Sequence, residues 1–373
     1  MGEGSSYRVI SCPRAAVMEK IGADGQLPAT MRAVRFDSDT GALTVDEVPL
    51  PVPDLDEVVV RVVACGVGKY DVNRIEGRVK PVSPVFTPGR EAAGLVMAVG
   101  ERVKFWSPGD RVVMTAVREC RSCADCRMGG GADNCTEPQM MATHYDGAWA
   151  EYTVTSATAL VAVPDSIPLE YATVLSGAVS TPYGALDTAR LRPAEAVGVW
   201  GLGSFGTHMV QLARICGASP IVALDECPVA RERALKLGAD VALDPANRHM
   251  TSYIREITKG LGLDVAFDFV GSTSTSRQAR EVLGERGRLV MVGSSPDIYH
   301  SQPEFAGVRN KQTILSHSGY SVKHLKDLVE LLERGRLDVS ASITAIVPLE
   351  QVSEGLRKVR EGDGDPLRLL LRP

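Results

Sequence analysis

The sequence predicts an α/β protein in which a β-rich domain is followed by a doubly wound parallel sheet. Short β-type runs broken by Pro and Gly fill the first half of the chain, and strands alternate with helices after about Leu191. A glycine-rich turn directly follows the first strand of this second half. Because 373 residues exceed what one hydrophobic core usually serves, two domains are expected.

The β-rich domain is expected over residues 31–179. MRAVRF, LTVDEVPL and EVVVRVVACGV are β-type runs, and segments such as PLPVPDLDE and SPGDRVV separate strands with turns. A mostly antiparallel sheet is therefore predicted. Residues 1–30 lack the continuous apolar stretch of a secretory signal, and we expect them to form a loosely packed N-terminal extension.

The parallel sheet is expected over residues 180–325. AVGVW is a strand, and the helix THMVQLARICGA closes at Gly217. PIVALD, ADVALD, LDVAFDFVG and GRLVMVGSS are further strands, and the helices between them include PVARERALKLGA, SYIREITKG and SRQAREVLGERG. This alternation predicts parallel βαβ units with helices on both faces of the sheet. Residues 326–373 contain a helix and the terminal strand LRLLLRP, which we expect to return to the first domain.

The glycine-rich turn has the spacing of a dinucleotide-binding site. Gly201, Gly203 and Gly206 form G-x-G-x-x-G between a strand and a helix. The first glycine permits the tight turn, the second lets a pyrophosphate approach the backbone, and the third allows close packing of helix on strand. The helix N-terminus then offers free N–H groups to the phosphates. The alternative is a doubly wound domain with a tight turn and no cofactor.

An acidic residue is expected at the end of the next strand, where it would bind the ribose of the cofactor. Asp225 ends PIVALD and is followed by Glu226. Their carboxylates would accept hydrogen bonds from a ribose diol and repel a 2′-phosphate, so NAD is favoured over NADP. Two alternatives stay open: Asp225 as a helix cap, and a 2′-phosphate accepted by Arg231 and Arg233.

Four cysteines cluster in the first half of the chain. Cys120, Cys123, Cys126 and Cys135 give C-x2-C-x2-C-x8-C, a spacing that can close a tetrahedral thiolate shell around Zn²⁺. Such a shell leaves no open coordination position, so we expect one structural zinc ion per chain. Disulfides or free thiols are the alternative, and a cytosolic protein disfavours disulfides.

Composition limits the partners of the chain. A net charge of -5 and an isoelectric point near 5.8 argue against nucleic acid or a membrane surface, because both require a basic face. No stretch approaches the roughly 20 apolar residues of a membrane helix. We therefore expect a cytoplasmic protein that acts on a small-molecule substrate.

Together these motifs resemble the zinc-containing medium-chain dehydrogenase/reductase family, from about Met31 to Pro373. The resemblance is carried by ACGV with a following Asp, TPGREAAG, PGDRV, the cysteine lobe, DGAWAEY, GLGSFG and FDFVG. It implies a GroES-like catalytic domain, a Rossmann domain, and homodimers or homotetramers. It also implies cofactor contacts from Val270 and, at the pyrophosphate, from Arg368, for which a surface arginine is the alternative. The last spacer of the cysteine lobe is one residue longer than usual in this family, and Gly129–Gly131 is expected to tolerate it.

The chain departs from the family at the catalytic zinc. Gly68 stands where the family usually has a Cys ligand, and Arg90 stands where it has the His of G-H-E-x-x-G. The third ligand position aligns with Gly177 or its neighbour Ser176, and Glu91 is kept. A guanidinium cannot ligate a cation, and one carboxylate cannot hold Zn²⁺ tightly. The sequence therefore predicts that the catalytic zinc is absent.

Five polar residues are candidates to act in its place. Tyr70 occupies the family's proton-relay position and could donate a proton, or it could only pack against the substrate. Arg90 could supply fixed positive charge, and Glu91 could act as acid or base or form a structural ion pair with Arg90. Lys69 falls where relatives meet the cofactor phosphates, and Asp71 is expected to orient a neighbour.

Two functions follow from these residues. The first is transfer of a hydride between NAD(H) and a small organic substrate, by alcohol/carbonyl interconversion or by reduction of a C=C or C=N bond. The second is a catalytically silent cofactor-binding or interaction protein on the same scaffold. The intact dinucleotide turn argues against the second function.

Overall fold

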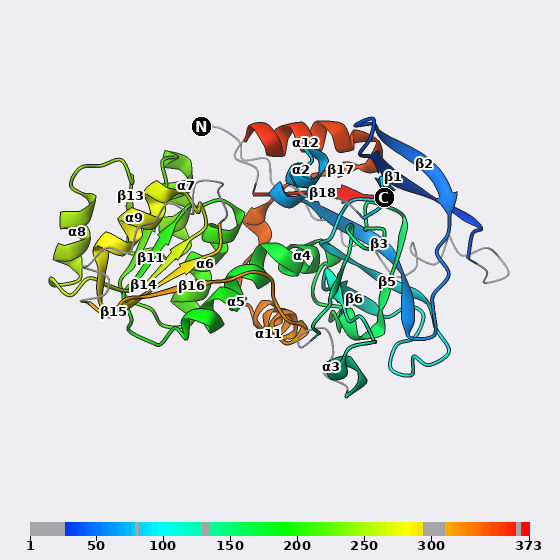
Figure 1. Cartoon of the computed structure of the whole chain (residues 1–373), viewed down its shortest axis with the longest axis horizontal. Helices are drawn as coiled ribbons and strands as arrows, with labels where there is room; N and C mark the ends of the chain where they lie inside the picture. The colour runs from blue at the N-terminus through cyan, green and yellow to red at the C-terminus, as the bar shows by residue number, and fades with distance from the viewer. Residues whose placement is uncertain (1–26, 79–81, 129–134, 294–309, 363–366) are drawn as a thin grey trace.

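The computed structural model describes residues 27–78, 82–128, 135–293, 310–362 and 367–373. A β-rich lobe and a lobe built on a parallel sheet lie side by side, with helices α5 (Ser180–Ala189) and α11 (Val322–Glu333) between them (Figure 1). Most of the expected N-terminal extension and Gly129–Gly131 lie outside the described residues. In the part that is described, no helix is both long and apolar enough to cross a membrane.

The β-rich lobe contains two mainly antiparallel sheets. One has the order β2-β1-β4, and the other runs β10-β6-β5-β3-β18-β17, with β9 also paired to β3. The bounds are β1 (Thr30–Asp37), β2 (Leu43–Pro49), β3 (Glu57–Val67), β4 (Val85–Phe86), β5 (Ala92–Val99), β6 (Arg111–Met114), β9 (Tyr152–Ser156), β10 (Leu160–Ala162), β17 (Ile343–Pro348) and β18 (Arg368–Arg372). The small pair β7 (Val117–Arg118) and β8 (Gln139–Met140) lies beside the cysteine lobe with the short helix α3 (Ala124–Arg127).

The last strand returns the C-terminal segment to the sheet of the β-rich lobe. Strand β18 pairs antiparallel with the end of β3, Leu369 opposite Val67, and parallel with β17. This pairing puts the C-terminal arginines beside the segment that follows β3. The domain boundaries at residues 30, 179 and 325 stay predictions.

The second lobe contains a six-stranded parallel sheet with the order β13-β12-β11-β14-β15-β16. Its strands are β11 (Val197–Trp200), β12 (Ile221–Leu224), β13 (Val241–Leu243), β14 (Leu263–Asp268), β15 (Leu283–Met291) and β16 (Thr313–Ser316). Because the chain moves from β11 outward to one edge and then restarts at β14 on the other side, the strand order reverses at β11. Ligands of open α/β sheets bind at this switch point.

Within the described residues, four helices connect the strands of this sheet: α6 (Ser204–Ile215), α7 (Pro228–Lys236), α8 (Met250–Ile257) and α9 (Thr273–Val282). One sequence-based boundary was wrong. The segment SRQAREVLGERG was expected to be helical throughout, but α9 ends at Val282 and β15 begins at Leu283, whose backbone is extended. Strand β15 pairs with β14 from this residue onward, so sheet pairing overrides the helical pattern there.

Helices also appear where the sequence predicted strands and turns. They are α2 (Lys69–Ile75), α4 (Leu169–Val174), the π-helical turn η3 (Leu175–Val179) and the first turns of α5. Helix α12 (Val352–Glu361) lies against the β-rich lobe (Figure 1). Helix α2 begins at Gly68, where the Asp71 side chain accepts a hydrogen bond from the Gly68 N–H at 3.0 Å.

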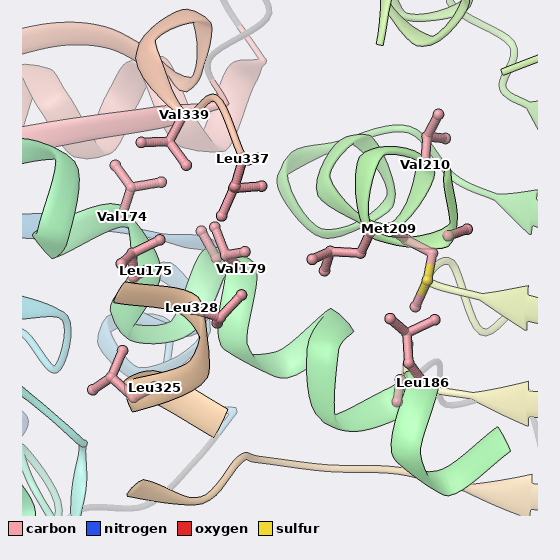
Figure 2. Packing of buried hydrophobic residues seen from close by; sticks show 14 of the residues in the cluster. Val174, Leu175, Val179, Leu186, Met209, Val210, Leu325, Leu328, Leu337 and Val339 are labelled. Carbon is pink, nitrogen blue, oxygen red and sulfur yellow. The ribbon is translucent and has the colours of Figure 1, made fainter. Parts of the chain in front are cut away.

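One hydrophobic core is shared by the two lobes. It includes Leu95 of β5, Val199 of β11 and Leu325 of α11, all buried. In Figure 2, Leu186 of α5 points toward Met209 of α6, and α11 packs beside the kinked segment at Leu175. Because apolar packing is continuous between the lobes, it holds the two lobes against each other.

Candidate active site

The dinucleotide turn has the backbone geometry that its spacing predicts. Gly201 has a positive φ of +83°, and a Cβ on Gly206 would lie 1.8 Å from the Gly201 carbonyl oxygen. At Gly203, by contrast, a Cβ would meet nothing within 4 Å, so the backbone is open to an approaching group. A Cβ on Gly201 would lie 2.7 Å from Val270 Cγ2, which places Val270 against this turn. Gly203 is the N-cap of α6, so the residues present fit a pyrophosphate.

Asp225 follows β12, and its side chain binds the backbone of the glycine-rich turn. Its carboxylate accepts hydrogen bonds from the N–H of Leu202 at 2.6 Å and of Cys227 at 2.8 Å. The N-cap of α7 is Cys227 rather than Asp225. Arg231 donates to the carbonyl oxygens of Asp225 and Glu226, so its guanidinium is held by the backbone.

The four cysteines converge as their spacing predicts. The sulfurs of Cys120, Cys123, Cys126 and Cys135 lie within 4.8 Å of one another. Backbone N–H groups point at these sulfurs, from Cys120 to Cys135 Sγ at 3.2 Å and from Cys123 to Cys120 Sγ at 3.4 Å. Hydrogen bonds from Ser122 lower the pKa of the Cys120 thiol to about 6, which favours the thiolate form. These donors fit a four-thiolate zinc site that pins the lobe.

Glu91 lies at the start of β5 and turns toward the end of the chain. Its Oε2 lies 3.1 Å from Nε of Arg368, and the Glu91 side chain is 16% exposed. The expected pair between Glu91 and Arg90 is therefore wrong, because β18 brings Arg368 to Glu91 instead. Burial raises the pKa of the Glu91 carboxyl to about 7, and the charge of Arg368 opposes that rise.

Arg368 is not a surface residue. It is 5% exposed, and its Nη1 lies 2.6 Å from where a Cβ on Gly68 would be. The alternative of a surface arginine is therefore wrong, whereas a contact with the pyrophosphate stays a prediction.

Side chains lie directly against Gly68 and Gly177, which the resemblance aligns with zinc-ligand positions. A Cβ on Gly177 would lie 2.5 Å from Glu91 Oε1, and a Cβ on Gly68 would meet Arg368. Both glycines thus leave room for the Glu91–Arg368 pair. Gly177 has a φ of +126°, a conformation that L side chains rarely adopt. Positions 68, 90 and 177 offer hydrogen, a guanidinium and hydrogen, and the alternative third position, Ser176, offers a hydroxyl, so these residues are a poor zinc ligand set; the absence of a catalytic zinc ion stays a prediction.

Arg90 and Tyr70 form the polar wall beside this pair. The guanidinium carbon of Arg90 lies 3.3 Å above the centroid of the Tyr70 ring. The Tyr70 hydroxyl lies 3.4 Å from both Met140 Sδ and Thr143 Oγ1. The structure thus brings Tyr70, Arg90 and Glu91 together, whereas Lys69 is exposed on the first turn of α2 and Asp71 is buried as its cap.

Sequence reasoning missed several residues of this region. Tyr320 donates to or accepts from Ser176 Oγ at 3.3 Å, and burial raises the pKa of its phenol. Trp149 Nε1 donates to the Gly66 carbonyl oxygen at 3.0 Å. No local spacing marks these residues, because they come from distant segments. Arg74 lies four residues after Tyr70 on α2, a spacing that indicates a shared face only once this segment is known to be helical.

Known proteins share both halves of this architecture. A family model described as "Zinc-binding dehydrogenase" matches residues 205–334, and one described as "Alcohol dehydrogenase GroES-like domain" matches residues 54–165. An alcohol dehydrogenase of Moraxella sp. is 32% identical over 326 residues, which cover 86% of this chain and 93% of that protein. This chain belongs to the medium-chain dehydrogenase/reductase family.

Further relatives of this medium-chain dehydrogenase agree. An NAD-dependent alcohol dehydrogenase of Sulfurisphaera tokodaii is 29% identical and covers 87% of this chain and 95% of that protein. The structure of alcohol dehydrogenase TADH from Thermus sp. ATN1 superposes with a TM-score of 0.83 at 28% identity, covering 92% of this chain and 99% of that one. The chain is accordingly an NAD(P)-dependent oxidoreductase with a GroES-like domain and a Rossmann domain.

Proposed function

We propose that this oxidoreductase transfers a hydride between NAD(H) and a small organic substrate without a catalytic zinc ion. The proposal rests on one observation. Gly68 and Gly177 align with zinc-ligand positions of the family, and the side chains of Arg368 and Glu91 lie directly against them. One zinc ion per chain would then be bound, by the four cysteines. The substrate bond is a C=O, C=C or C=N bond. We further propose a cytoplasmic homodimer or homotetramer.

Reduction of such a bond needs one hydride and one proton. NAD(H) bound at the Gly201–Gly206 turn would supply the hydride, and a side chain of this chain must give a proton to the neighbouring oxygen, nitrogen or carbon atom. Tyr70 presents a hydroxyl on this wall, and the pKa of Glu91, raised to about 7, lets its carboxyl exchange a proton near neutral pH. Arg90 supplies fixed positive charge where a metal would otherwise polarise the substrate.

Metal analysis tests the zinc part of the proposal. Protein purified without added chelator should contain about one zinc ion per chain, as expected for a single four-thiolate shell. The Cys123→Ser variant should lose it. Two zinc ions per wild-type chain would overturn the proposal that the catalytic metal is missing.

Isotope transfer tests the chemical part. NADH deuterated at C4 is incubated with a panel of carbonyl, enone and imine compounds, and deuterium in the products is measured by mass spectrometry. Transfer to one class supports the proposal and identifies the substrate bond. Tight NADH binding with no transfer to any compound would favour the catalytically silent alternative.

A further inference from the structure

Arg74 lies in the last turn of α2 and is almost wholly buried. The residue is 2% exposed, and Nε, Nη1 and Nη2 all lack a hydrogen-bond partner among the described residues. Its guanidinium carbon lies 4.8 Å from the centroid of the Phe86 ring. That contact covers one face of the guanidinium and leaves its edge, which carries the five N–H donors, unsatisfied.

Burying a guanidinium without hydrogen-bond partners destabilises the folded state. Arginine stays protonated in proteins, so it cannot escape the desolvation penalty by losing its charge. Buried charges are normally paired, and buried donors without a partner in a native structure indicate an ion or water that belongs there. Burial lowers the pKa of Arg74, its neighbours Tyr70 and Asp71 oppose this shift, and the charge of Arg90 adds to it.

Arg90 likewise has no carboxylate partner within the described part of the chain. It contacts the Tyr70 ring and donates a hydrogen bond to Met140 Sδ at 3.1 Å. Tyr70 and Arg74 lie four residues apart and therefore share one face of α2. This face of the helix and Arg90 thus present two guanidiniums without a carboxylate partner on the same wall.

Neither of the two nearby carboxyls, of Glu91 and Asp71, forms an ion pair with Arg74 or Arg90 among the described residues. Glu91 is taken by Arg368 at 3.1 Å, and Asp71 accepts from the Gly68 N–H at the start of α2. Both carboxyls are largely buried, and burial raises the pKa of each. The three guanidiniums of Arg74, Arg90 and Arg368 therefore outnumber the two carboxyls in this region.

We infer that Arg74 and Arg90 form a subsite for an oxyanion, and that the substrate carries a carboxylate or phosphate group that binds there. The planar N–H fork of arginine matches either group in a bidentate manner. This inference rests on the proposed function, because it places the anion on the substrate rather than on the cofactor. An anionic group bound there would orient the reactive bond relative to Tyr70.

Binding of small anions to the NAD⁺-saturated protein tests the inference. Saturation with NAD⁺ fills the pyrophosphate site, so that a further anion must bind elsewhere. Acetate is compared with acetamide, which has nearly the same shape and no charge, and inorganic phosphate is titrated in parallel. Dissociation constants are measured by calorimetry. We expect acetate or phosphate to bind at least about tenfold more tightly than acetamide, since hydrogen bonds to charged groups exceed neutral ones by about that factor. The tighter of the two anions identifies the group.

Three variants locate the site. Arg74→Gln and Arg90→Gln should each weaken anion binding about tenfold or more, and Arg74→Lys should retain part of it because the charge remains. Arg78→Gln is the matched control, because Arg78 is 69% exposed and pairs with Glu76 at the end of the same segment. It should leave anion binding unchanged. Thermal unfolding midpoints verify that each variant is folded.

The outcomes separate the inference from the proposed function. Equal binding of acetate and acetamide, anion binding that NAD⁺ abolishes, or an anion preference that survives both glutamine substitutions would each overturn the subsite. Deuteride transfer could still be observed in every one of these cases, and the proposed function would then stand. Loss of anion binding in both glutamine variants, with the control unchanged, supports the subsite.

Discussion

Gly177→Ala is the sharpest test of how the site is built. The new Cβ would lie 2.5 Å from Glu91 Oε1 and 2.7 Å from its Cδ, at a φ of +126°. The backbone conformation costs about 1–3 kcal/mol for a residue other than glycine. Overpacking against Glu91 adds about 1–3 kcal/mol, because Glu91 is held by Arg368 and must move. We therefore expect the free energy of unfolding to fall by about 2–6 kcal/mol.

A second glycine serves as the control for the backbone term. Gly41 has a φ of +74°, and nothing lies within 4 Å of its potential Cβ. Gly41→Ala should therefore cost only about 1–2 kcal/mol. Urea unfolding followed by tryptophan fluorescence gives both free energies with a shared slope. If Gly177→Ala destabilises no more than Gly41→Ala does, Glu91 does not occupy the position assigned to it. In the Gly177→Ala/Glu91→Ala double variant, the packing part of the loss should be recovered.

Three further substitutions probe the proton, the cofactor and the substrate. Folding raises the pKa of Glu91 from 4.5 to about 7. The protonated carboxyl therefore stabilises the folded state. This contribution to the free energy of unfolding is complete below pH 4.5 and is lost as the pH rises through 7. Between pH 4.5 and 8, the free energy of unfolding of the wild type relative to Glu91→Gln should thus fall by about 3 kcal/mol, and urea titrations that run parallel at all pH values would contradict this. Asp225→Ala should weaken the preference for NAD over NADP, measured as the ratio of the two dissociation constants, and a wild type that already prefers NADPH would show that Asp225 was misinterpreted. Tyr70→Phe should lower kcat by about 10²-fold or more with little change in KM, and unchanged turnover would leave Tyr70 only a packing role.

The motifs that sequence inspection identified are local, and this is why they could be found. The roles of Gly201, Gly203 and Gly206 depend on one turn between a strand and a helix, and the turn has the expected geometry. The four cysteines lie close together because a short loop can bring them together. The alternation of strands and helices likewise predicted the parallel sheet, since periodicity is set by neighbours along the chain.

The partners of the buried charges depend on contacts between distant segments. One alternative paired Glu91 with its neighbour Arg90, yet the pairing of β18 with β3 brings Arg368 to it. Arg90 and Glu91 lie in the loop before β5, where adjacency in sequence does not by itself bring two side chains into contact. The missing partner of Arg74 is visible only when every described neighbour is in place. Short-range spacing thus predicts where a cofactor or zinc ion binds, whereas the charge left for a substrate depends on how the strands and helices pack.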